Sequence, residues 1–282
     1  MRKIDKIQYN LSDVIEECLS HKREQEFIKK IQDNKVTILN EYKLYVKCAK
    51  KLEFHKASQC KSIGCVTKRD MVELYNCFRS SVKTYYDQIK LSSAHNICPY
   101  CCQRTVSEVD HYLPKSKKIS LSIAPLNLVP ICSDCNKAKG EHYPNNQEER
   151  FINPHFDPLI NKRWLEAEVL KSENDIPSFK FYVNDSVFSS LEQEICRRIQ
   201  YHFTKLKLNT LYISQSGTTL TSITKRLKKD WKRGGMIKVK EYLSEELDSF
   251  EDDNINSWKA AMYRAMLKSD WFCNDWCGRD DS

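Results

Sequence analysis

Four cysteines form two closely spaced pairs near the middle of the sequence. Cys98 and Cys101 are separated by two residues, and Cys132 and Cys135 repeat that spacing further along the chain. Two such pairs can each supply two thiolates to one tetrahedral zinc ion, and soft thiolate ligands suit zinc. A redox-active C-x-x-C would explain one pair but not the second. The spacing therefore predicts a structural Zn²⁺ held by these four residues.

Residues beside the two pairs could carry out hydrolytic chemistry. Asp110 and His111 follow the first pair, and Asn136 comes directly after Cys135. Phosphodiester hydrolysis needs an activated water and a cation that neutralises the developing phosphate charge. An imidazole can take a proton from water near neutral pH, and carboxylate and amide oxygens suit Mg²⁺ or Mn²⁺. We expect His111 to act as general base, with Asp110 and Asn136 holding the catalytic cation.

The order of these motifs resembles a known family. The string C-P-Y-C…V-D-H-Y-L-P-K-S…N-L-V-P-I-C-S-D-C-N-K-A-K-G is similar to zinc-stabilised HNH endonucleases of the ββα-metal class. The likeness covers about fifty of the 282 residues, and Asn136 stands at the third motif position, where histidine is the common alternative. It implies that Asn127 belongs to the catalytic set and orients the His111 loop through hydrogen bonds.

Three lysines are candidates for contacts with a nucleic acid, namely Lys115, Lys137 and Lys139. Lys139 lies three residues after Asn136, on nearly the same helical face, so it could reach a phosphate. Lys115 opens a basic run with Lys117 and Lys118, which could equally be a solvated charged loop. DNA is the expected partner, and RNA stays open as an alternative.

A second basic cluster lies in residues 220–240, and an acidic stretch follows it. The chain carries a net charge of +8, which favours an anionic partner. Lysine and arginine could neutralise phosphates there and release counterions. The same residues could instead form an exposed helical face paired with the acidic stretch. The sequence leaves both interpretations open.

The expected fold is α+β and mainly helical, with three regions: helical residues 1–92, the HNH core with its zinc knuckles at 93–158, and mainly helical residues 159–282. The spacing of Leu11, Val14, Ile15 and Leu19 predicts a helix capped by Ser12 or Asp13. A second helix is expected over 69–91 and a strand over 179–183. Ser189 or Ser190 should cap a later helix, with Leu191 on its buried face.

The start of the chain has no apolar stretch typical of a signal peptide, and no run is long enough to span a bilayer. With thirteen cysteines, the sequence therefore predicts a cytoplasmic protein with reduced thiols and no membrane partner. Two further cysteine pairs, Cys60 with Cys65 and Cys273 with Cys277, are expected to be free buried thiols rather than a second metal site.

The segment R-F-I-N-P-H-F-D-P at residues 150–158 resembles stretches that follow the HNH core in bacterial anti-phage effectors, such as those of Septu and retron-linked systems. That resemblance implies a nuclease subunit that works with an ATPase subunit of a defence complex. One alternative is a stand-alone restriction-type or homing-type endonuclease. Another is a non-catalytic zinc module that binds nucleic acid or a partner, although such a binder would not need Asp110, His111 and Asn136.

Overall fold

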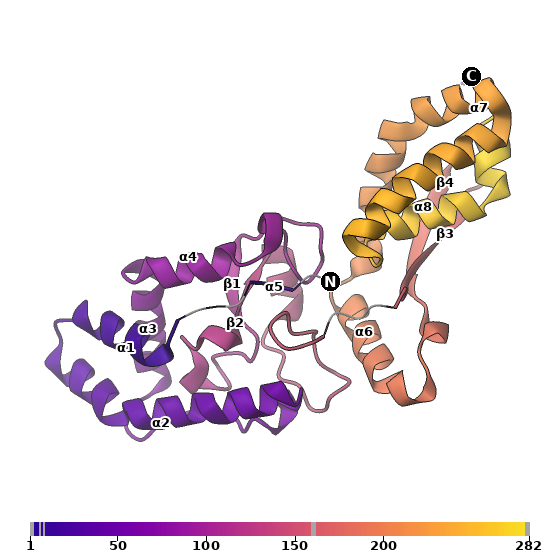
Figure 1. The fold of residues 1–282 in the computed structure, drawn as a ribbon. Coiled ribbons are helices and arrows are strands. Elements are labelled where there is room, and N and C mark those ends of the chain that lie inside the picture. Colours follow the sequence, from indigo (N-terminus) through magenta and orange to yellow (C-terminus); the bar gives the residue numbers. More distant parts are fainter. Residues whose placement is uncertain (1–2, 6, 8, 159–161, 280–282) are drawn as a thin grey trace. The chain divides into compact units, whose positions relative to one another are not determined.

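The computed structural model describes residues 3–5, 7, 9–158 and 162–279. The chain divides into two compact units, Met1–Leu159 and Ile160–Ser282, which are described separately below (Figure 1). Residue 159, where the third predicted region begins, lies outside the described residues. The division into three regions stays a prediction.

Four α-helices precede the cysteine motifs in the first unit: α1 (Leu11–Ser20), α2 (Gln25–Lys50), α3 (Lys68–Ser80) and α4 (Lys83–Leu91). The residues predicted to form the apolar face of α1 are all buried. The cap differs from the prediction, because the Asn10 side chain accepts a hydrogen bond from the Ser12 backbone N–H. Asparagine is among the strongest N-cap residues, so the helix begins two or three residues earlier than expected.

The single helix predicted over 69–91 is wrong, because the chain breaks between α3 and α4. The backbone N–H groups of Ser81 and Val82 both donate to the carbonyl of Cys77. Val82 then leaves the helical region, with φ −102° and ψ 44°. The hydroxyl of Ser80 bonds back to the Asn76 carbonyl, and such side-chain bonds compete with regular helix geometry.

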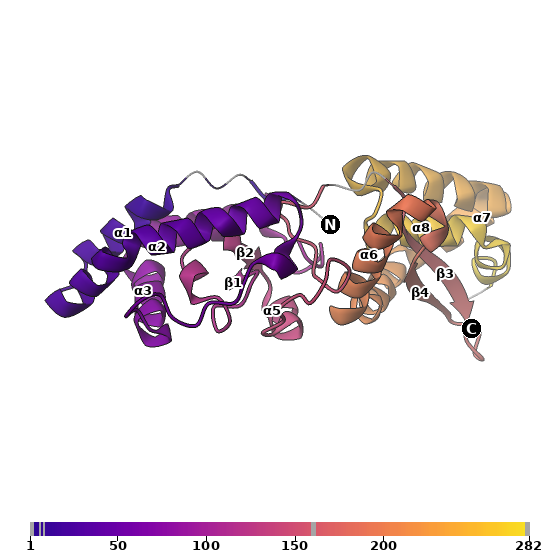
Figure 2. The ribbon, with the colours of Figure 1, turned by 90° about the horizontal axis from the view of Figure 1, so that it is seen from below.

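A small antiparallel hairpin and one short helix follow. Strand β1 (Glu108–His111) pairs with β2 (Leu128–Ile131), and α5 (Ser133–Lys139) begins directly after β2. Because side chains alternate along a strand, Glu108 and Asp110 share one face while Val109 and His111 are buried on the other. Helix α4 contacts both strands. Figure 1 shows this ββα arrangement beside α4, and Figure 2 shows β1, β2 and α5 from below. Four 3-10 turns complete the unit: η1 (Phe54–Lys56), η2 (Ala94–Asn96), η3 (Ile119–Leu121) and η4 (Pro125–Asn127).

Residues 150–158, the closing segment, fasten the end of the first unit to its core. The fully buried Arg150 makes two hydrogen bonds to Asp157, at 2.6 and 2.9 Å. The Tyr112 hydroxyl donates to the Phe151 carbonyl at 2.7 Å, and His155 Nε2 bonds to the Leu128 carbonyl at 2.8 Å. The segment that resembles defence effectors therefore stabilises β2 and the loop after β1.

The second unit pairs a β-hairpin with helices. Strand β3 (Leu165–Lys171) is antiparallel to β4 (Pro177–Val183), so the predicted strand 179–183 is confirmed. The other elements are η5 (Asp185–Val187), η6 (Ser190–Glu192), α6 (Gln193–Lys205), α7 (Leu208–Asn254), α8 (Trp258–Lys268) and the π-helix η7 (Trp271–Trp276). Ser189, one of the two predicted caps, forms a capping box with Glu192 at the start of η6. Leu191 is 95% exposed, contrary to the prediction, because it lies in η6 before α6 begins.

Helix α7 is two helical arms joined at a glycine pair. Gly234 and Gly235 leave helical geometry, and Gly235 has φ 63°, which favours glycine. The Arg226 guanidinium lies 4.8 Å from the centre of the Tyr242 ring. Sixteen residues of continuous helix would separate these groups by about 24 Å. The contact therefore requires the second arm to fold back along the first.

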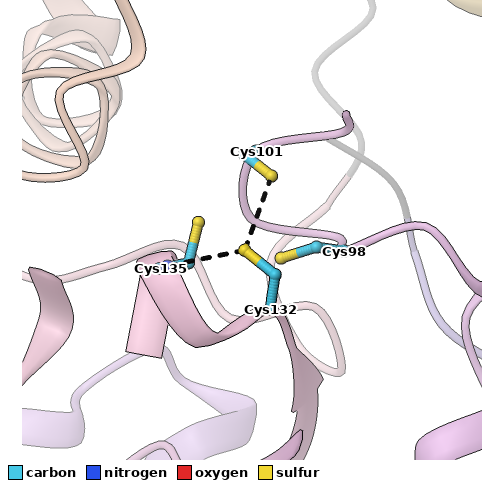
Figure 3. A group of neighbouring side chains, drawn as sticks. All are labelled: Cys98, Cys101, Cys132 and Cys135. Carbon is cyan, nitrogen blue, oxygen red and sulfur yellow. Dashed lines mark hydrogen bonds between the residues drawn. The ribbon is translucent and has the colours of Figure 1, made fainter. Parts of the chain in front are cut away.

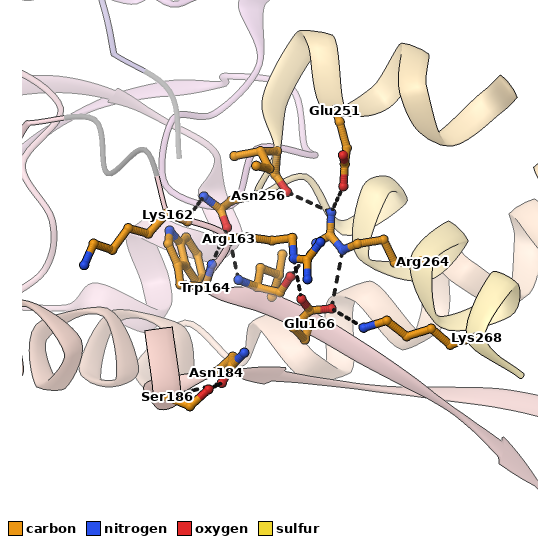
Figure 4. A network of polar contacts seen from close by, with 12 residues as sticks. Lys162, Arg163, Trp164, Glu166, Asn184, Ser186, Glu251, Asn256, Arg264 and Lys268 are labelled. Atoms are coloured by element: carbon orange, nitrogen blue, oxygen red, sulfur yellow. Dashed lines mark hydrogen bonds and ion pairs between the residues drawn. The ribbon is translucent and has the colours of Figure 1, made fainter. Parts of the chain in front are cut away.

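A buried polar network joins β3 to α7 and α8 (Figure 4). Asn256 Oδ1 accepts hydrogen bonds from the backbone N–H groups of Trp164 and Leu165. Arg264, which is 3% exposed, pairs with Glu166 and Glu251 and donates to the Leu165 carbonyl. Each buried polar group thus has a partner, which fixes the helices against one edge of the hairpin.

The two additional cysteine pairs differ from one another. Cys273 and Cys277 are buried free thiols as predicted, but Cys65 is exposed and Cys60 is only half-buried. The short turn carrying Cys60 and Cys65 lies at the surface, so burial of this pair was wrongly predicted. Of the helices described, none combines the length and apolar character needed to cross a membrane.

Candidate active site and metal centre

The four cysteines of the two pairs meet in one buried cluster (Figure 3). Their Sγ atoms all lie within 4.8 Å of one another, and Cys101 Sγ is 3.9 Å from Cys132 Sγ. Zinc–sulfur bonds of about 2.3 Å in a tetrahedron place sulfurs roughly 3.8 Å apart. Across the described parts of the chain this is the one group of three or more His, Cys, Asp or Glu side chains close enough to hold a metal ion. The donor set and its spacing fit zinc.

Local backbone geometry presents these thiols. After Cys98 the chain turns tightly, with the Cys102 N–H bonded to the Cys98 carbonyl and Cys102 in the left-handed region at φ 52°. Cys132 is the N-cap of α5, and its Sγ accepts a hydrogen bond from the Cys135 backbone N–H at 3.4 Å. The Arg104 N–H likewise donates to Cys101 Sγ. Backbone donors aimed at sulfur favour the thiolate form that a metal requires.

Asp110 and Asn136 lie where α5 packs against the Glu108–Asp110 face of β1. Asp110 is on β1, and Asn136 is on α5, which packs against β1. The Asn136 amide nitrogen donates to Glu108, the neighbour of Asp110 on the same strand face. Asn136 Oδ1 has no hydrogen bond among the described residues. A carboxylate pair and an amide oxygen of this kind suit a hard divalent cation.

His111 is buried, with 4% of its surface exposed. Its Nε2 lies 2.7 Å from the Ser122 carbonyl oxygen. A carbonyl can only accept, so the ring proton is on Nε2 and the lone pair of the neutral ring is on Nδ1. Burial lowers the pKa of His111 to about 4, although the Asp110 charge opposes that shift. The imidazole is therefore neutral at pH 7 and able to accept a proton.

The structure places Lys139 inside the site. Its side chain is 1% exposed, and its Nζ lies 2.8 Å from Asp110 Oδ2 and donates to the His111 carbonyl at 2.7 Å. The contact with Asp110 is an ion pair, since no well-aligned hydrogen bond to Oδ2 is found within the described residues. Lys139 thus ties α5 to β1 and neutralises part of the Asp110 charge.

Asn127, which is fully buried, joins the two ends of the loop between β1 and β2. Its Oδ1 accepts from the Leu113 N–H at 2.8 Å, and its Nδ2 donates to the Leu113 carbonyl at 3.0 Å. Nδ2 also approaches the Leu121 carbonyl at 3.4 Å. These bonds hold the residues that follow His111 and the turn before its acceptor, Ser122.

Basic residues from another element approach the same place. Lys115 Nζ lies 4.1 Å from the centre of the Tyr75 ring, and that ring is 4.8 Å from the His111 ring. Burial lowers the pKa of Lys115, and the charges of Arg79 and Lys68 act in the same direction while Asp110 opposes them. Helix α3 therefore brings Arg79 and Lys68, both exposed, toward Asp110.

The remaining lysines differ in accessibility. Lys137 is exposed on α5, as a nucleic-acid contact requires. Lys118 is 2% exposed and pairs with Glu41 at 2.5 Å. The idea that Lys118 grips a nucleic acid is therefore wrong, because a long-range ion pair to α2 buries its ammonium.

Sequence reasoning overlooked Glu108, Tyr75, Arg79 and Lys68. The two-residue periodicity of a strand could have put Glu108 beside Asp110. Tyr75 and Arg79 are one helical turn apart on α3, and only the packing of that helix brings Tyr75 to His111 and Arg79 close enough to affect Lys115. No local motif marks them.

Residues 98–142 match the family model described as HNH endonuclease. The chain therefore carries an HNH endonuclease domain, and the resemblance drawn from the motifs is confirmed. Protein ea31 of Escherichia phage lambda is 28% identical over 234 residues, covering 74% of this chain and 75% of that protein. That match is longer than the first unit, so it extends into the second.

Septu protein PtuB of Bacillus thuringiensis is 36% identical over 84 residues, which is 28% of this chain and 32% of PtuB. The match spans about a third of the length of PtuB, and it supports the resemblance to defence-associated HNH proteins. No solved structure matches the chain.

Proposed function

We propose that this protein is a metal-dependent HNH endonuclease that hydrolyses phosphodiester bonds in DNA. The observation that carries the proposal is the neutral, oriented His111 next to Asp110 on β1, together with the contacts that Asn136 and Lys139 of α5 make to the Glu108–Asp110 face of that strand. A structural zinc held by Cys98, Cys101, Cys132 and Cys135 would fix β2 and α5 in that arrangement.

Each side chain has a role that follows from its contacts. Asp110 and Asn136 would hold Mg²⁺ or Mn²⁺, which supplies positive charge against the scissile phosphate when bound. His111 takes the proton of the attacking water at Nδ1, because Nε2 is fixed to Ser122. Asn127 keeps that loop in place. Lys139 acts as a positioning residue for Asp110 rather than as a phosphate contact.

Substrate binding would use the cations around the site. Lys115 and Arg79 lie on the side of Asp110 that faces α3, and Lys137 is exposed on α5. Such residues neutralise backbone phosphates without reading bases. DNA is the proposed substrate, and RNA remains the alternative to be compared in the same assay.

We further propose that the protein acts in the cytoplasm as the nuclease of an anti-phage defence complex. The identity with Septu protein PtuB and the closing segment at 150–158 support this role. The partner implied by the resemblance is an ATPase subunit. A stand-alone restriction-type or homing-type nuclease would need no such partner.

A cleavage assay tests the activity. Wild-type protein, a His111→Ala variant and a His21→Ala control would each be incubated with supercoiled plasmid and Mg²⁺ or Mn²⁺. His21 is exposed at the end of α1, away from the site. We expect nicking by the wild type and the control, and a loss of about 10²- to 10⁴-fold for His111→Ala, the range for a general base.

Equal nicking by His111→Ala and the wild type would contradict the general-base role. A wild type that binds DNA but never cuts it, with or without a copurified partner, would favour the non-catalytic zinc module. Cleavage only in the presence of a copurified ATPase would favour the defence complex over the stand-alone enzyme.

A further inference from the structure

The second unit contains a hollow lined entirely by basic side chains. Its volume is about 470 Å³, and its lining residues are Lys225, Lys228, Lys229, Lys232, Arg233 and Arg279. Five of them come from the first arm of α7, and Arg279 follows the π-helix η7. Arg279 is far from the others in sequence, so the hollow is a product of the fold.

The basic cluster of residues 220–240 is divided by the structure into two parts. Outside the hollow, Arg226 pairs with Asp230, Lys238 with Glu241, and Lys240 with Asp270. Within the hollow, Arg233 and Arg279 have carboxylate partners, at 3.8 and 2.6 Å. Among the described residues, Lys225 and Lys229 have none. No carboxylate side chain lines the hollow itself.

Charge at a helix end offers a simpler explanation, which fits Lys232 and Arg233 in the last turn of the arm but not Lys225. Cations near a helix C-terminus are stabilising, but the effect fades beyond the last turn. The first arm ends at the glycine pair Gly234–Gly235, and Lys225 lies more than two turns before it. Lys225 and Lys229, which have no carboxylate partner among the described residues, lie one helical turn apart and repel one another, which costs stability unless an anion lies near them.

The arrangement of the cations suggests the shape of that anion. The helical positions 225, 228, 229 and 232 fall on one face, and Lys225 to Arg233 span about 12 Å along the arm. One strand of duplex DNA presents a phosphate roughly every 3.4 Å of helix axis, so the row matches three or four phosphates. The lining has no aromatic side chain on which a free nucleotide base could stack.

We propose that this hollow binds the phosphate backbone of a nucleic acid, as a second contact surface separate from the HNH site. The identity of the polyanion rests on the proposed function. The contacts assigned to the hollow are to phosphates, because the spacing of its lysines along the helix matches the phosphate repeat. The hollow adds affinity and salt dependence rather than sequence preference.

Binding of a labelled 20-base-pair duplex, measured by fluorescence anisotropy over a range of salt without added divalent cation, tests the proposal. The hollow variant is Lys225→Gln/Lys229→Gln. The matched control, Lys238→Gln/Lys240→Gln, removes equal charge from ion-paired lysines of the same unit. The slope of log affinity against log salt should weaken by about 0.9 per lost phosphate contact, or about 2 for the hollow variant.

The affinity of the hollow variant should fall about tenfold relative to wild type at low salt, on the order expected for two lost phosphate contacts. The control should change less than threefold. Equal losses in both variants, or no loss in either, would overturn the proposal. Binding of tripolyphosphate through the hollow lysines, with duplex affinity unchanged, would also overturn it in favour of a small anion.

A parallel plasmid assay separates this inference from the proposed function. If the hollow variant loses duplex binding and the wild type never cleaves, phosphate binding by the hollow is supported and the nuclease activity is contradicted. If the wild type cleaves and the hollow variant binds duplex unchanged, the nuclease activity is supported and phosphate binding by the hollow is contradicted.

Discussion

At the scale of single residues, the ion pair between Lys139 and Asp110 changes how the site is understood. Helical spacing alone suggested that Lys139 reaches a phosphate, whereas its ammonium is buried between Asp110 and the His111 carbonyl. A candidate metal-binding carboxylate is thus held from one side by a fixed cation. This arrangement orients Asp110 and limits the repulsion that it would otherwise exert in a partly desolvated position.

Replacing Lys139 with methionine keeps much of its volume and removes the charge. We expect Lys139→Met to lower the free energy of unfolding by about 2–3 kcal/mol, because it leaves Asp110 without its cation; Asp110 is 18% exposed, so the loss should be smaller than for a fully buried pair. Urea denaturation would measure the change. Lys137→Met, on the exposed face of the same helix, should stay within about 0.5 kcal/mol.

The double variant Asp110→Asn/Lys139→Met should lose less stability than the sum of the two single variants, since both remove one interaction. If Lys139→Met were no more costly than Lys137→Met, the ion pair would have little structural value. The phosphate-contact role suggested by the sequence would then be the better interpretation of Lys139.

At the scale of elements, the closing segment 150–158 has a structural role. Its resemblance to segments of defence effectors comes from residues that bury Arg150 against Asp157 and bond His155 to the Leu128 carbonyl of β2. These contacts stabilise the strand that leads into the second cysteine pair. The closing segment can therefore affect activity without contacting substrate.

His155 in the closing segment should make the free energy of unfolding depend on pH. Burial lowers the pKa of His155 to about 4, below the ordinary value near 6.5. The unfolded chain then binds the proton more readily than the folded chain does. The contribution of buried, neutral His155 to the free energy of unfolding is therefore complete above pH 6.5 and declines as the pH falls toward 4. At pH 5 the loss should be about 2 kcal/mol.

His155→Gln can keep the hydrogen bond to Leu128 but cannot titrate. Denaturation curves between pH 7 and 5 should therefore show less destabilisation in this variant than in the wild type. Parallel curves for the two proteins would contradict the assignment to His155.

At the scale of the whole molecule, the two units obtain their stability from different sources. The first unit places its cysteine cluster where β2, α5 and the loop after η2 meet, whereas the second relies on a packed hairpin and the network around Arg264 and Asn256. Removal of a structural metal should therefore affect the two units unequally.

Elemental analysis should find about one zinc ion per chain, and Cys98→Ser should lose it and unfold the first unit, because structural zinc binding is coupled to folding. Cys102→Ser, beside the cluster but outside it, should keep the metal. Hydrogen exchange after treatment with a chelator should show lost protection in residues 95–140 and retained protection in β3, β4 and α8. Well-folded protein without zinc would contradict this assignment.

The sequence by itself determined the elements whose signals are local. Paired C-x-x-C spacing, the Asp110-His111 dipeptide, the apolar face of α1 and the strand at 179–183 all depend on neighbours within a few residues, where periodicity and ligand spacing are informative. The HNH domain could be recognised for the same reason.

Only the tertiary structure decided which charges are buried, paired or free. Lys118 reaches Glu41 on α2, Lys139 reaches Asp110 on β1, and Arg279 joins lysines of α7 that precede it by more than 45 residues. The sequence also left two interpretations of the basic cluster in residues 220–240 open. In the structure, some of its residues form ion pairs and others line the cationic hollow. The physical reason is that the energy of a charge depends on its burial and its nearest partners, and neither is encoded in the spacing of one segment.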